Sequence, residues 1–501
     1  MSSDSPRFAD VRLLDEPSST MSPEENDDIE AQMSHLSLGP DKQHMDEVLS
    51  SPLLTVPVVQ STPPPQFGLF GANRSGDAPP RASRLFYNVT CPSSVFICGS
   101  QGSGKSNTLA CLLENCLIPS RLGKLPTPLT GIVFHYDSFV SDSGGLPCEA
   151  AFLASSKEVS VRVLCAPTNI RTVQGIYGRI PGVKVERLIL SDRDLNTRRM
   201  LDLMAVGEGG MPLYLHVVTR ILRDMRIDQQ STGSGFNYTT FKKHLDLADL
   251  TPAQRGPLSQ RLDTLESFMT KGTVDKGKGN AAVGKPTVDW QAKSSQLTIV
   301  DLSCPCVTAE MACSLFNICL SLFLEQESPI GRVVAVDEAH KYMKESSESQ
   351  ALTAALLETI RLQRHLGVRV IISTQEPTVS TKLLDLCSMT VVHRFTSPDW
   401  LRTLRSHLAG VSSMSVTASG RGETEDVGSV VIEGKDPVLE LFALIVGLHT
   451  GEALVFAPSA VIGLGEGRTG RPVAVQRLAH RSLRVQVRSR LTTDGGQTIM
   501  A

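Results

Sequence analysis

Short apolar runs recur along the chain, and most of them end in a glycine or a polar residue. The clearest runs are typical of buried strands and cover 95–98, 131–136, 297–302, 333–336 and 368–373. Weaker runs of the same kind occur at 159–165, 185–190, 389–393 and 452–456. Segments with apolar residues at helical spacing lie between them. Strands that alternate with helices form a mainly parallel sheet, so the pattern predicts an α/β fold.

The pattern becomes helical in the middle of the chain, where apolar residues gather at 200–204, 213–222 and 258–268. A glycine-rich stretch at 271–285 follows, and we expect it to be a flexible loop. We therefore predict a first part of the core at 83–191, a helical insertion with a flexible loop at 192–290, and a second part of the core at 291–467.

Residues 1–82 differ from the rest of the chain in composition. They are rich in Ser, Pro, Asp and Glu, and they hold 13 acidic and 5 basic residues. Such a segment buries too little apolar surface to offset its chain entropy. We therefore predict a disordered acidic leader, whose partner is not identified, and expect that its removal leaves ATPase activity intact. The net charge of the whole chain is −3, which argues against a strongly basic nucleic-acid-binding protein.

No apolar run approaches the ~18 residues that a membrane span requires, and a secretory pattern is lacking. We therefore expect a soluble, intracellular protein without a membrane span. Many of the 11 cysteines lie within apolar segments and are interpreted as free core residues. The densest group, at 304–319, fits no structural zinc spacing, so a metal site there is disfavoured.

The strongest chemical signal is Gly99-x-x-x-x-Gly104-Lys105-Ser106, which lies between a predicted strand and a predicted helix. This is the full phosphate-binding pattern. Glycines let backbone N–H groups surround phosphate oxygens, and the helix start adds its free N–H groups. We expect Lys105 to contact the β- and γ-phosphates of ATP, and Ser106 to bind Mg²⁺. The residues expected at the nucleotide are Gly99, Ser100, Gln101, Gly102, Ser103, Gly104, Lys105, Ser106 and Asn107.

A second signal is the pair Asp337-Glu338, which follows the apolar run at 333–336. A carboxylate at a strand end can hold the Mg²⁺ shell, and we assign this role to Asp337. The next carboxylate can polarise water toward the γ-phosphate, and we assign this role to Glu338. Gln375 closes the strand predicted at 368–373 and is placed to sense the γ-phosphate or orient the water. Together with the phosphate loop, these residues predict an ATP hydrolase.

The sequence resembles the HerA/FtsK family of ATPases over most of residues 83–460. The resemblance is carried, in the family's order, by VFICGSQGSGKSNTLACLL, LTIVDLS, VVAVDEAHKYM, RLQRHLGVRVIISTQEP, VVHRF and TGEALVF. It implies a RecA-like P-loop core with Glu338 as the catalytic base and Gln375 as the sensor. It also implies a homo-oligomer, usually a hexameric ring, that moves along DNA.

The family resemblance further implies an arginine that reaches the nucleotide of a neighbouring subunit. Arg364 fits this role best, with Arg361 and Arg394 as rivals. The chain departs from the family in its acidic leader and in the expected lack of a small barrel domain before the phosphate loop. These departures leave the assembly and the partner open.

Three other functions are compatible with parts of these motifs. The letters Asp-Glu-Ala-His at 337–340 also occur in DEAH-class RNA helicases, but the Ser-Ala-Thr and late glutamine–arginine motifs of that class are lacking. A transporter-type ATPase is disfavoured because no Leu-Ser-Gly-Gly-Gln stretch occurs. The alternative left open is an ATP-gated switch or interaction protein, which uses the same core without translocation and the acidic leader for docking.

The C-terminal segment, 468–501, is predicted as a basic tail. Its arginines are Arg468, Arg471, Arg477, Arg481, Arg484, Arg488 and Arg490, with no acidic residue between them. Apolar residues alternate with polar ones at 483–487, which favours a half-buried strand. The arginines would then face solvent, a neighbouring subunit or a phosphate backbone. We expect deletion of 468–501 to weaken assembly or polymer binding while nucleotide binding persists.

Overall fold

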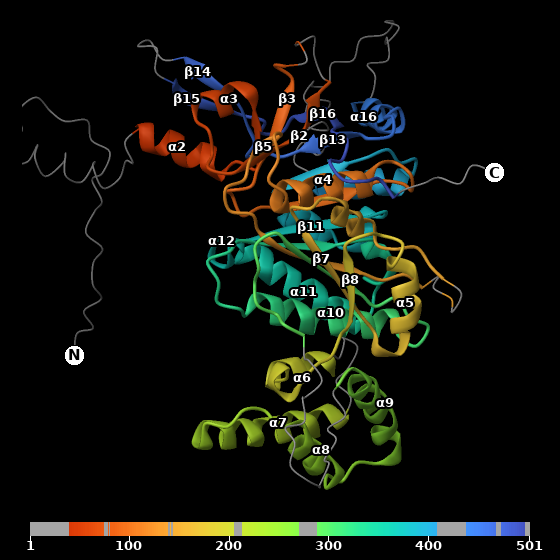
Figure 1. Cartoon of the computed structure of the whole chain (residues 1–501). Coiled ribbons are helices and arrows are strands. Elements are labelled where there is room, and N and C mark those ends of the chain that lie inside the picture. Colours follow the sequence, from red (N-terminus) through yellow and green to blue (C-terminus); the bar gives the residue numbers. More distant parts are fainter. Residues whose placement is uncertain are drawn as a thin grey trace, which may run out of the picture.

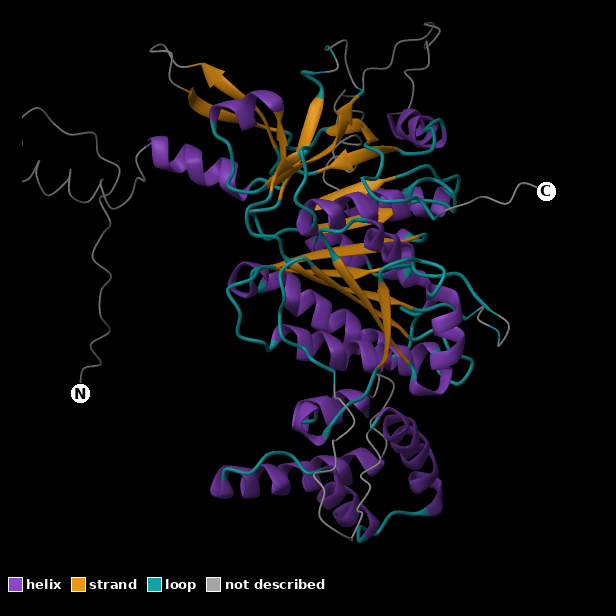
Figure 2. Cartoon of the chain, viewed as in Figure 1, coloured by secondary structure: helices purple, strands orange, loops and turns teal. Residues whose placement is uncertain are grey.

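The structure is a computed structural model of all 501 residues. It describes residues 40–74, 79, 81–138, 141, 144–204, 213–269, 288–407, 437–466 and 472–495. One 16-stranded sheet runs through the molecule, and helices cover its central part on both faces (Figure 1, Figure 2). The sheet has a parallel part, which carries the phosphate loop, and an antiparallel part, which joins the two ends of the chain.

The parallel part of the sheet has the order β12-β4-β11-β10-β6-β9-β7-β8. Its strands are β4 (Ser94–Cys98), β6 (Thr130–His135), β7 (Ser160–Cys165), β8 (Val183–Arg187), β9 (Gln296–Asp301), β10 (Arg332–Val336), β11 (Val368–Thr374) and β12 (Met389–Val392). Each neighbouring pair is parallel. The predicted α/β fold with a mainly parallel sheet is therefore confirmed, and β11 lies between the strand of the phosphate loop and the strand of the acidic pair, as in a RecA-like core.

Two hydrophobic cores cover the two faces of the parallel sheet. On β10, Val333 and Ala335 belong to the core that includes helix α4 (Lys105–Leu117), whereas Val334 and Val336 belong to the core of helix α10 (Ala309–Leu324). Successive side chains of a strand point to opposite faces, so an uninterrupted apolar run serves both cores. Other helices around this sheet are α5 (Ile170–Tyr177), α11 (Ser347–Arg361), α12 (Gln363–Leu366), α13 (Thr381–Leu386), α14 (Pro398–His407) and α16 (Pro437–Val446).

Four helices occupy the range predicted for the helical insertion. They are α6 (Thr197–Leu203), α7 (Leu213–Thr232), α8 (Tyr238–Asp246) and α9 (Pro252–Phe268). They lie together beyond α10 and α11, at the opposite end of the molecule from the antiparallel strands (Figure 1). Phe241 and Leu265, both fully buried, form part of the core of this group. The glycine-rich stretch at 271–285 lies outside the described residues.

The predicted extent of the disordered leader, 1–82, is wrong. Its second half forms α2 (Pro40–Ser50), β1 (Leu53–Thr55), α3 (Val56–Ser61) and β2 (Phe67–Asn73). Leu53 and Leu54 are buried, and Leu54 pairs with Val461 near the other end of the chain. The segment looks too polar to fold by itself, but its apolar surface is buried by strands some four hundred residues away. Residues 1–39 lie outside the described residues.

The mainly antiparallel part of the sheet has the order β15-β14-β1-β3-β2-β16-β13, in which β14 and β1 form one parallel pair, and β13 continues it onto β12. Its further strands are β3 (Arg84–Asn88), β13 (Glu452–Phe456), β14 (Val461–Glu466), β15 (Pro472–Arg477) and β16 (Ser482–Val487), while β5 (Gly123–Lys124) pairs with β2. A small barrel domain was not expected before the phosphate loop, and the structure has strands β1, β2 and β3 there, paired as an antiparallel β unit. The N-terminal strands build such a unit jointly with C-terminal ones.

The segment predicted as a basic tail also belongs to this sheet. β16 alternates between half-buried and buried residues, as the pattern at 483–487 predicted, and it pairs with both β13 and β2. The boundary drawn at residue 468 therefore separates strands that fold together. Within the described part of the chain, no helix is both long enough and apolar enough to span a membrane.

Candidate nucleotide-binding site

The loop between β4 and α4 has the backbone that a phosphate site requires. Gly99, Gly102 and Gly104 have φ angles of 150°, 72° and 110°, which only glycine adopts readily. A Cβ at Gly99 would lie 2.6 Å from Cβ of His393, and one at Gly104 would lie 2.9 Å from the backbone N of Gly451. The loop is therefore fixed in place by close backbone approach as well as by its own turns.

Lys105 begins α4 and is 4% exposed. Its Nζ donates a hydrogen bond to the carbonyl oxygen of Ser100, 3.0 Å away within the same loop. Burial lowers the pKa of the Lys105 ammonium, and the nearby carboxylates of Glu338 and Asp337 oppose this shift. The loop, the lysine and the two carboxylates thus form one electrostatic unit, although β11 separates their strands in the sheet.

Asp337 follows β10 and is 3% exposed. Its Oδ2 lies 3.2 Å from Nδ1 of His135 and 3.6 Å from Sγ of Cys148. Burial would raise the pKa of the Asp337 carboxyl, but the hydrogen bond and the charge of His135 outweigh it, so the pKa is lowered. Its Oδ1 is buried and has no hydrogen-bond partner among the described residues.

That unpartnered oxygen tests whether these residues fit Mg²⁺. A buried carboxylate oxygen without a hydrogen bond is costly unless a ligand satisfies it. Mg²⁺ binds oxygen ligands and often uses only one or two protein groups beside phosphates and water. Asp337 Oδ1 and the hydroxyl of Ser106, in the first turn of α4, provide such groups. The residues present therefore fit the ion.

Glu338 adopts a left-handed backbone, with φ 49° and ψ 43°. A residue other than glycine in this region costs about 1 kcal/mol or more, and such strain tends to persist where it positions a functional group. Its Oε2 accepts a hydrogen bond from Nε2 of Gln375 at 3.2 Å. Burial, and then the charge of Asp337, raises the pKa of the Glu338 carboxyl. The two residues that the sequence assigned as base and sensor are thus in direct contact.

His340 is a further member of this group, and the sequence analysis assigned it no role. Its Nδ1 accepts the backbone N–H of Gln375 at 3.3 Å, and its Nε2 lies 3.4 Å from Oε2 of Glu338. Burial lowers the pKa of His340 to about 4. A neutral imidazole that accepts at Nδ1 carries its proton on Nε2, so His340 presents an N–H to Glu338. The short spacing Glu-x-His was the available signal.

The three candidate arginines lie in two places. Arg361 and Arg364 precede β11, at the edge of the sheet opposite to the phosphate loop, and both are exposed. Arg394 is also exposed, but it follows β12 beside the loop, where its carbonyl oxygen accepts the backbone N–H and the hydroxyl of Ser100, each at 2.8 Å. Among the described residues, no arginine forms an ion pair with either carboxylate of the acidic pair.

Asn107 differs from the role expected for its side chain. Its Nδ2 donates to the carbonyl oxygen of Arg488 at 3.1 Å, so the amide binds the C-terminal segment. The same segment is held by Glu114, which is fully buried on α4 and whose Oε2 lies 2.6 Å from Nη1 of Arg488. Glu114 also accepts the backbone N–H groups of Leu491 and Thr492 at 3.0 Å. The nucleotide helix is therefore anchored to the end of the chain.

His393 forms a second link between the loop and the antiparallel strands. Its Nδ1 donates to the carbonyl oxygen of Glu452, and its Nε2 accepts from the hydroxyl of Thr108, both at 2.9 Å. Burial lowers the pKa of His393 to about 4, so the ring is neutral and can accept at Nε2. Sequence reasoning missed this histidine because its partners lie on distant elements.

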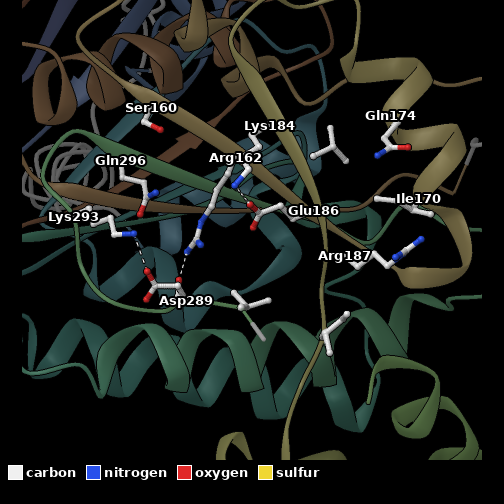
Figure 3. Close-up of a pocket in the computed structure, with 13 residues that line it drawn as sticks. Ser160, Arg162, Ile170, Gln174, Lys184, Glu186, Arg187, Asp289, Lys293 and Gln296 are labelled. Carbon is white, nitrogen blue, oxygen red and sulfur yellow. Dashed lines mark hydrogen bonds and ion pairs between the residues drawn. The ribbon is translucent and has the colours of Figure 1, made fainter. Parts of the chain in front are cut away.

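A cavity of about 670 Å³ lies elsewhere, at the β8 edge of the sheet (Figure 3). The buried Arg162 donates to the hydroxyl of Thr298 at 2.9 Å and to the carbonyl oxygen of Asp289 at 2.7 Å. Two lysines of the cavity also form ion pairs within it, Lys184 with Glu186 and Lys293 with Asp289. None of the residues of the phosphate loop or the acidic pair lines this cavity, so we place the chemistry at the loop and not here.

No protein-family model matches the sequence, and no curated protein matches it either. The fold is similar to that of VirB4 of Thermoanaerobacter pseudethanolicus, with 12% identity, a TM-score of 0.48, and 85% of this chain and 96% of that chain covered. It is also similar to the plasmid coupling protein TrwB in complex with ADP and Mg²⁺, with 13% identity, a TM-score of 0.43, and 80% and 87% covered.

A shorter likeness is to the genome packaging NTPase B204 from Sulfolobus turreted icosahedral virus 2, with 14% identity and a TM-score of 0.21. It covers 32% of this chain and 61% of that chain. The assignment of the nucleotide site rests on the residues described above. The resemblance to the HerA/FtsK-type P-loop ATPases is likewise carried by the motifs of this chain.

Proposed function

We propose that this protein is a Mg²⁺-dependent ATPase. The observation that carries the proposal is the contact of Glu338 with Gln375, beside a buried Asp337 with one unpartnered oxygen and a lysine from an intact phosphate loop. If the loop were only a chance glycine-rich turn, these carboxylates and the glutamine would not be expected to gather beside it. The separate parts come from β4, β10 and β11, which the parallel sheet brings together at one edge.

The loop would bind the β- and γ-phosphates through its backbone N–H groups, the N-terminus of α4 and the Lys105 ammonium. Burial lowers the pKa of Lys105, and a phosphate beside it would favour the charged form. Asp337 and Ser106 would hold Mg²⁺, which when bound supplies positive charge that stabilises the negative charge developing on the transferred phosphoryl group. Each of these groups belongs to a buried, preorganised framework, which favours electrostatic catalysis.

Glu338 would act as the general base that accepts a proton from the attacking water. A base is most effective when its pKa is near the working pH, and burial together with Asp337 raises the pKa of Glu338. The hydrogen bond from Gln375 fixes one carboxylate oxygen, and the N–H of His340 faces the same oxygen. The other oxygen of Glu338 is then available to the water.

The family resemblance supports assembly into a ring in which Arg364 acts on the neighbour's nucleotide. Arg364 is exposed and lies at the far edge of the sheet from its own phosphate loop, as a residue that acts between subunits must. Arg361 shares this location, whereas Arg394 lies beside its own loop. The same resemblance supports DNA as the polymer along which the ring would move.

The test of this proposal is the ATPase rate of the full chain with Mg²⁺, measured with and without double-stranded DNA at low salt. A motor in which Arg364 acts on the neighbouring subunit's nucleotide would be supported if DNA stimulates the rate and Arg364→Ala abolishes this stimulation. Arg402→Ala should keep it. Arg402 is a suitable control because it is exposed and, within the described ranges, its one ion pair is with Asp399 on the same helix. Hydrolysis that neither DNA nor RNA changes would favour the ATP-gated switch.

A further inference from the structure

Asp337 is held by a strand that the proposed chemistry does not otherwise use. β6 pairs in parallel with β10, and its last residue, His135, stands beside Asp337. The backbone N–H of Asp337 donates to the carbonyl oxygen of Phe134 at 3.0 Å, so the two strand ends are in fixed register. His135 is 6% exposed, and its Nδ1 lies 3.2 Å from Asp337 Oδ2. A carboxylate oxygen can only accept, so Nδ1 carries the hydrogen.

The backbone of His135 is held by the next strand, and the segment beyond it contacts Asp337. The carbonyl oxygen of His135 accepts the backbone N–H of Leu302, which follows β9. Cys148 packs against the same carboxylate oxygen of Asp337, and its backbone N–H donates to the hydroxyl of Tyr177 at 2.9 Å. Tyr177 in turn donates to Asp301 at 2.6 Å. A buried hydrogen-bond network therefore runs from Cys148, beside Asp337, through Tyr177 to Asp301 at the end of β9.

The two oxygens of Asp337 are thus in different situations. Oδ2 is engaged by His135 and Cys148, whereas Oδ1 is buried without a partner in the part of the chain that the structure describes. A carboxylate that binds a metal is commonly oriented by a hydrogen bond to its other oxygen, and loss of such a partner costs about 10–100-fold in metal affinity. The hydroxyl of Tyr342 donates to the backbone carbonyl of Asp337 at 3.1 Å and leaves the orientation of the carboxylate to His135.

We propose that His135 is a positioning residue for the metal. By holding Oδ2, it turns Oδ1 of Asp337 toward Mg²⁺ at the phosphate loop. The role rests on the proposed function, because it acts on the Mg²⁺ that the ATPase would use. This role requires a hydrogen-bond donor at the position of Nδ1. A side chain of similar volume without that donor would not fulfil it.

Three substitutions separate this donor from a merely structural role. His135→Asn keeps an N–H donor near the position of Nδ1, His135→Gln carries its donor farther out, and His135→Leu fills the space without one. Cys148→Ala is the matched control, because it removes a weak donor at 3.6 Å from the same oxygen. The measured quantities are the melting temperature, the affinity for ADP without Mg²⁺, and the Mg²⁺ concentration that gives half of the maximal gain in ADP affinity.

For His135→Leu and His135→Gln, we expect the half-maximal Mg²⁺ concentration to rise at least about 10-fold. For His135→Asn and Cys148→Ala, it should stay within about 3-fold of the parent's value. Affinity for ADP without Mg²⁺ should be unchanged in all four. The proposal would be overturned if His135→Gln had the Mg²⁺ requirement of the parent, or if His135→Asn and His135→Gln raised that requirement equally. The comparison of these two variants remains valid even if His135→Leu does not fold. If Mg²⁺ did not change the ADP affinity of the parent protein, that result would instead contradict the proposed function.

Discussion

Nη1 of Arg488 lies 2.6 Å from Oε2 of Glu114, and both side chains are buried between the nucleotide helix and the end of the chain. The guanidinium also donates to the carbonyl oxygens of Leu69 and Cys111 and to the side chain of Asn115. A buried ion pair stabilises a fold only when its remaining hydrogen bonds are satisfied. Here they are, so strand β2, helix α4 and the C-terminal segment meet at one point.

Arg488→Ala is therefore expected to lower the free energy of unfolding by about 3–5 kcal/mol, because it leaves Glu114 buried without its charged partner. Urea denaturation at pH 7 measures this change. Arg481→Ala is the control, since the exposed side chain of Arg481 makes a single hydrogen bond, of 3.4 Å, to the described residues, and it should change stability by less than about 0.5 kcal/mol. Equal, small effects of the two substitutions would contradict the anchoring role of Arg488.

This contact also revises the expectation that deleting 468–501 spares nucleotide binding. The deletion removes β16 from between β2 and β13 and removes the partners of Glu114 and Asn107 on α4. We expect the shortened protein to be insoluble or to lose nucleotide affinity. Expression of the 1–467 fragment and titration with ADP check this, and a soluble fragment with the parent's affinity would contradict it.

Lys105→Ala is expected to abolish ATP binding while leaving the fold at least as stable. The ammonium is buried, has one hydrogen bond within its loop, and has a pKa that burial lowers. A buried charge that gains little within the protein costs stability, so its removal should not lower the melting temperature. Calorimetric titration with ATP and a thermal melt test the two parts. ATP binding at the parent's affinity would refute the assignment of the loop.

The buried His393 makes the free energy of unfolding depend on pH. Burial lowers the pKa of His393 to about 4, from 6.5. A group whose pKa is lowered on folding contributes stability that is present above pH 6.5 and is lost as the pH falls toward 4, because the unfolded chain binds the proton first. Between pH 7 and pH 5, this loss is about 2 kcal/mol for His393.

Urea denaturation at pH 7 and pH 5 tests this prediction. His393→Gln has no titrating ring, so the stability advantage of the parent over the variant should shrink by about this amount between the two pH values. His480→Gln serves as a control, since His480 is an exposed residue in a turn. An advantage of the parent that does not change with pH would contradict the neutral, buried state of His393.

Truncations at the N-terminus should separate the two halves of the segment first predicted as a leader. Removal of 1–82 takes β1 and β2 out of the interior of the sheet order, where β1 lies between β14 and β3 and β2 between β3 and β16. We expect this truncation to abolish soluble expression, whereas removal of 1–39 should leave solubility and ATPase activity near the parent's. Equal solubility of the two truncations would show that these strands are dispensable.

The local parts of this structure could be predicted from the sequence. Val95–Cys98 and Val333–Val336 are uninterrupted apolar runs, and the glycines and Lys105 follow the first as Asp337 and Glu338 follow the second. Parallel pairing places such strand ends at one edge, which is why Glu338 and Gln375 could be assigned together before their hydrogen bond was known. In each case the pattern and the function lie within a few residues of each other.

The parts that could not be predicted depend on contacts between distant residues. Glu114 and Arg488 are 374 positions apart, and each alone resembles an ordinary surface charge in a helix or a tail. Leu53 and Leu54 belong to a polar segment, and their burial depends on β3 and β14. His135 ends an apolar strand like any polar residue, and only the pairing of β6 with β10 brings it to Asp337. Arg488 was expected to face solvent, a neighbouring subunit or a phosphate backbone, and it is buried because of contacts with equally distant residues.

The central claim, that Glu338 is the base of an ATPase, is tested most directly by a single turnover with Glu338→Gln. The amide keeps the shape of the side chain but cannot accept the proton of the attacking water. The measurement is the rate at which a stoichiometric amount of Mg·ATP is converted to ADP, with ATP affinity determined in parallel. We predict affinity within about 3-fold of the parent's and a hydrolysis rate at least about 100-fold lower. Hydrolysis at the parent's rate would contradict the account and move the base to another residue.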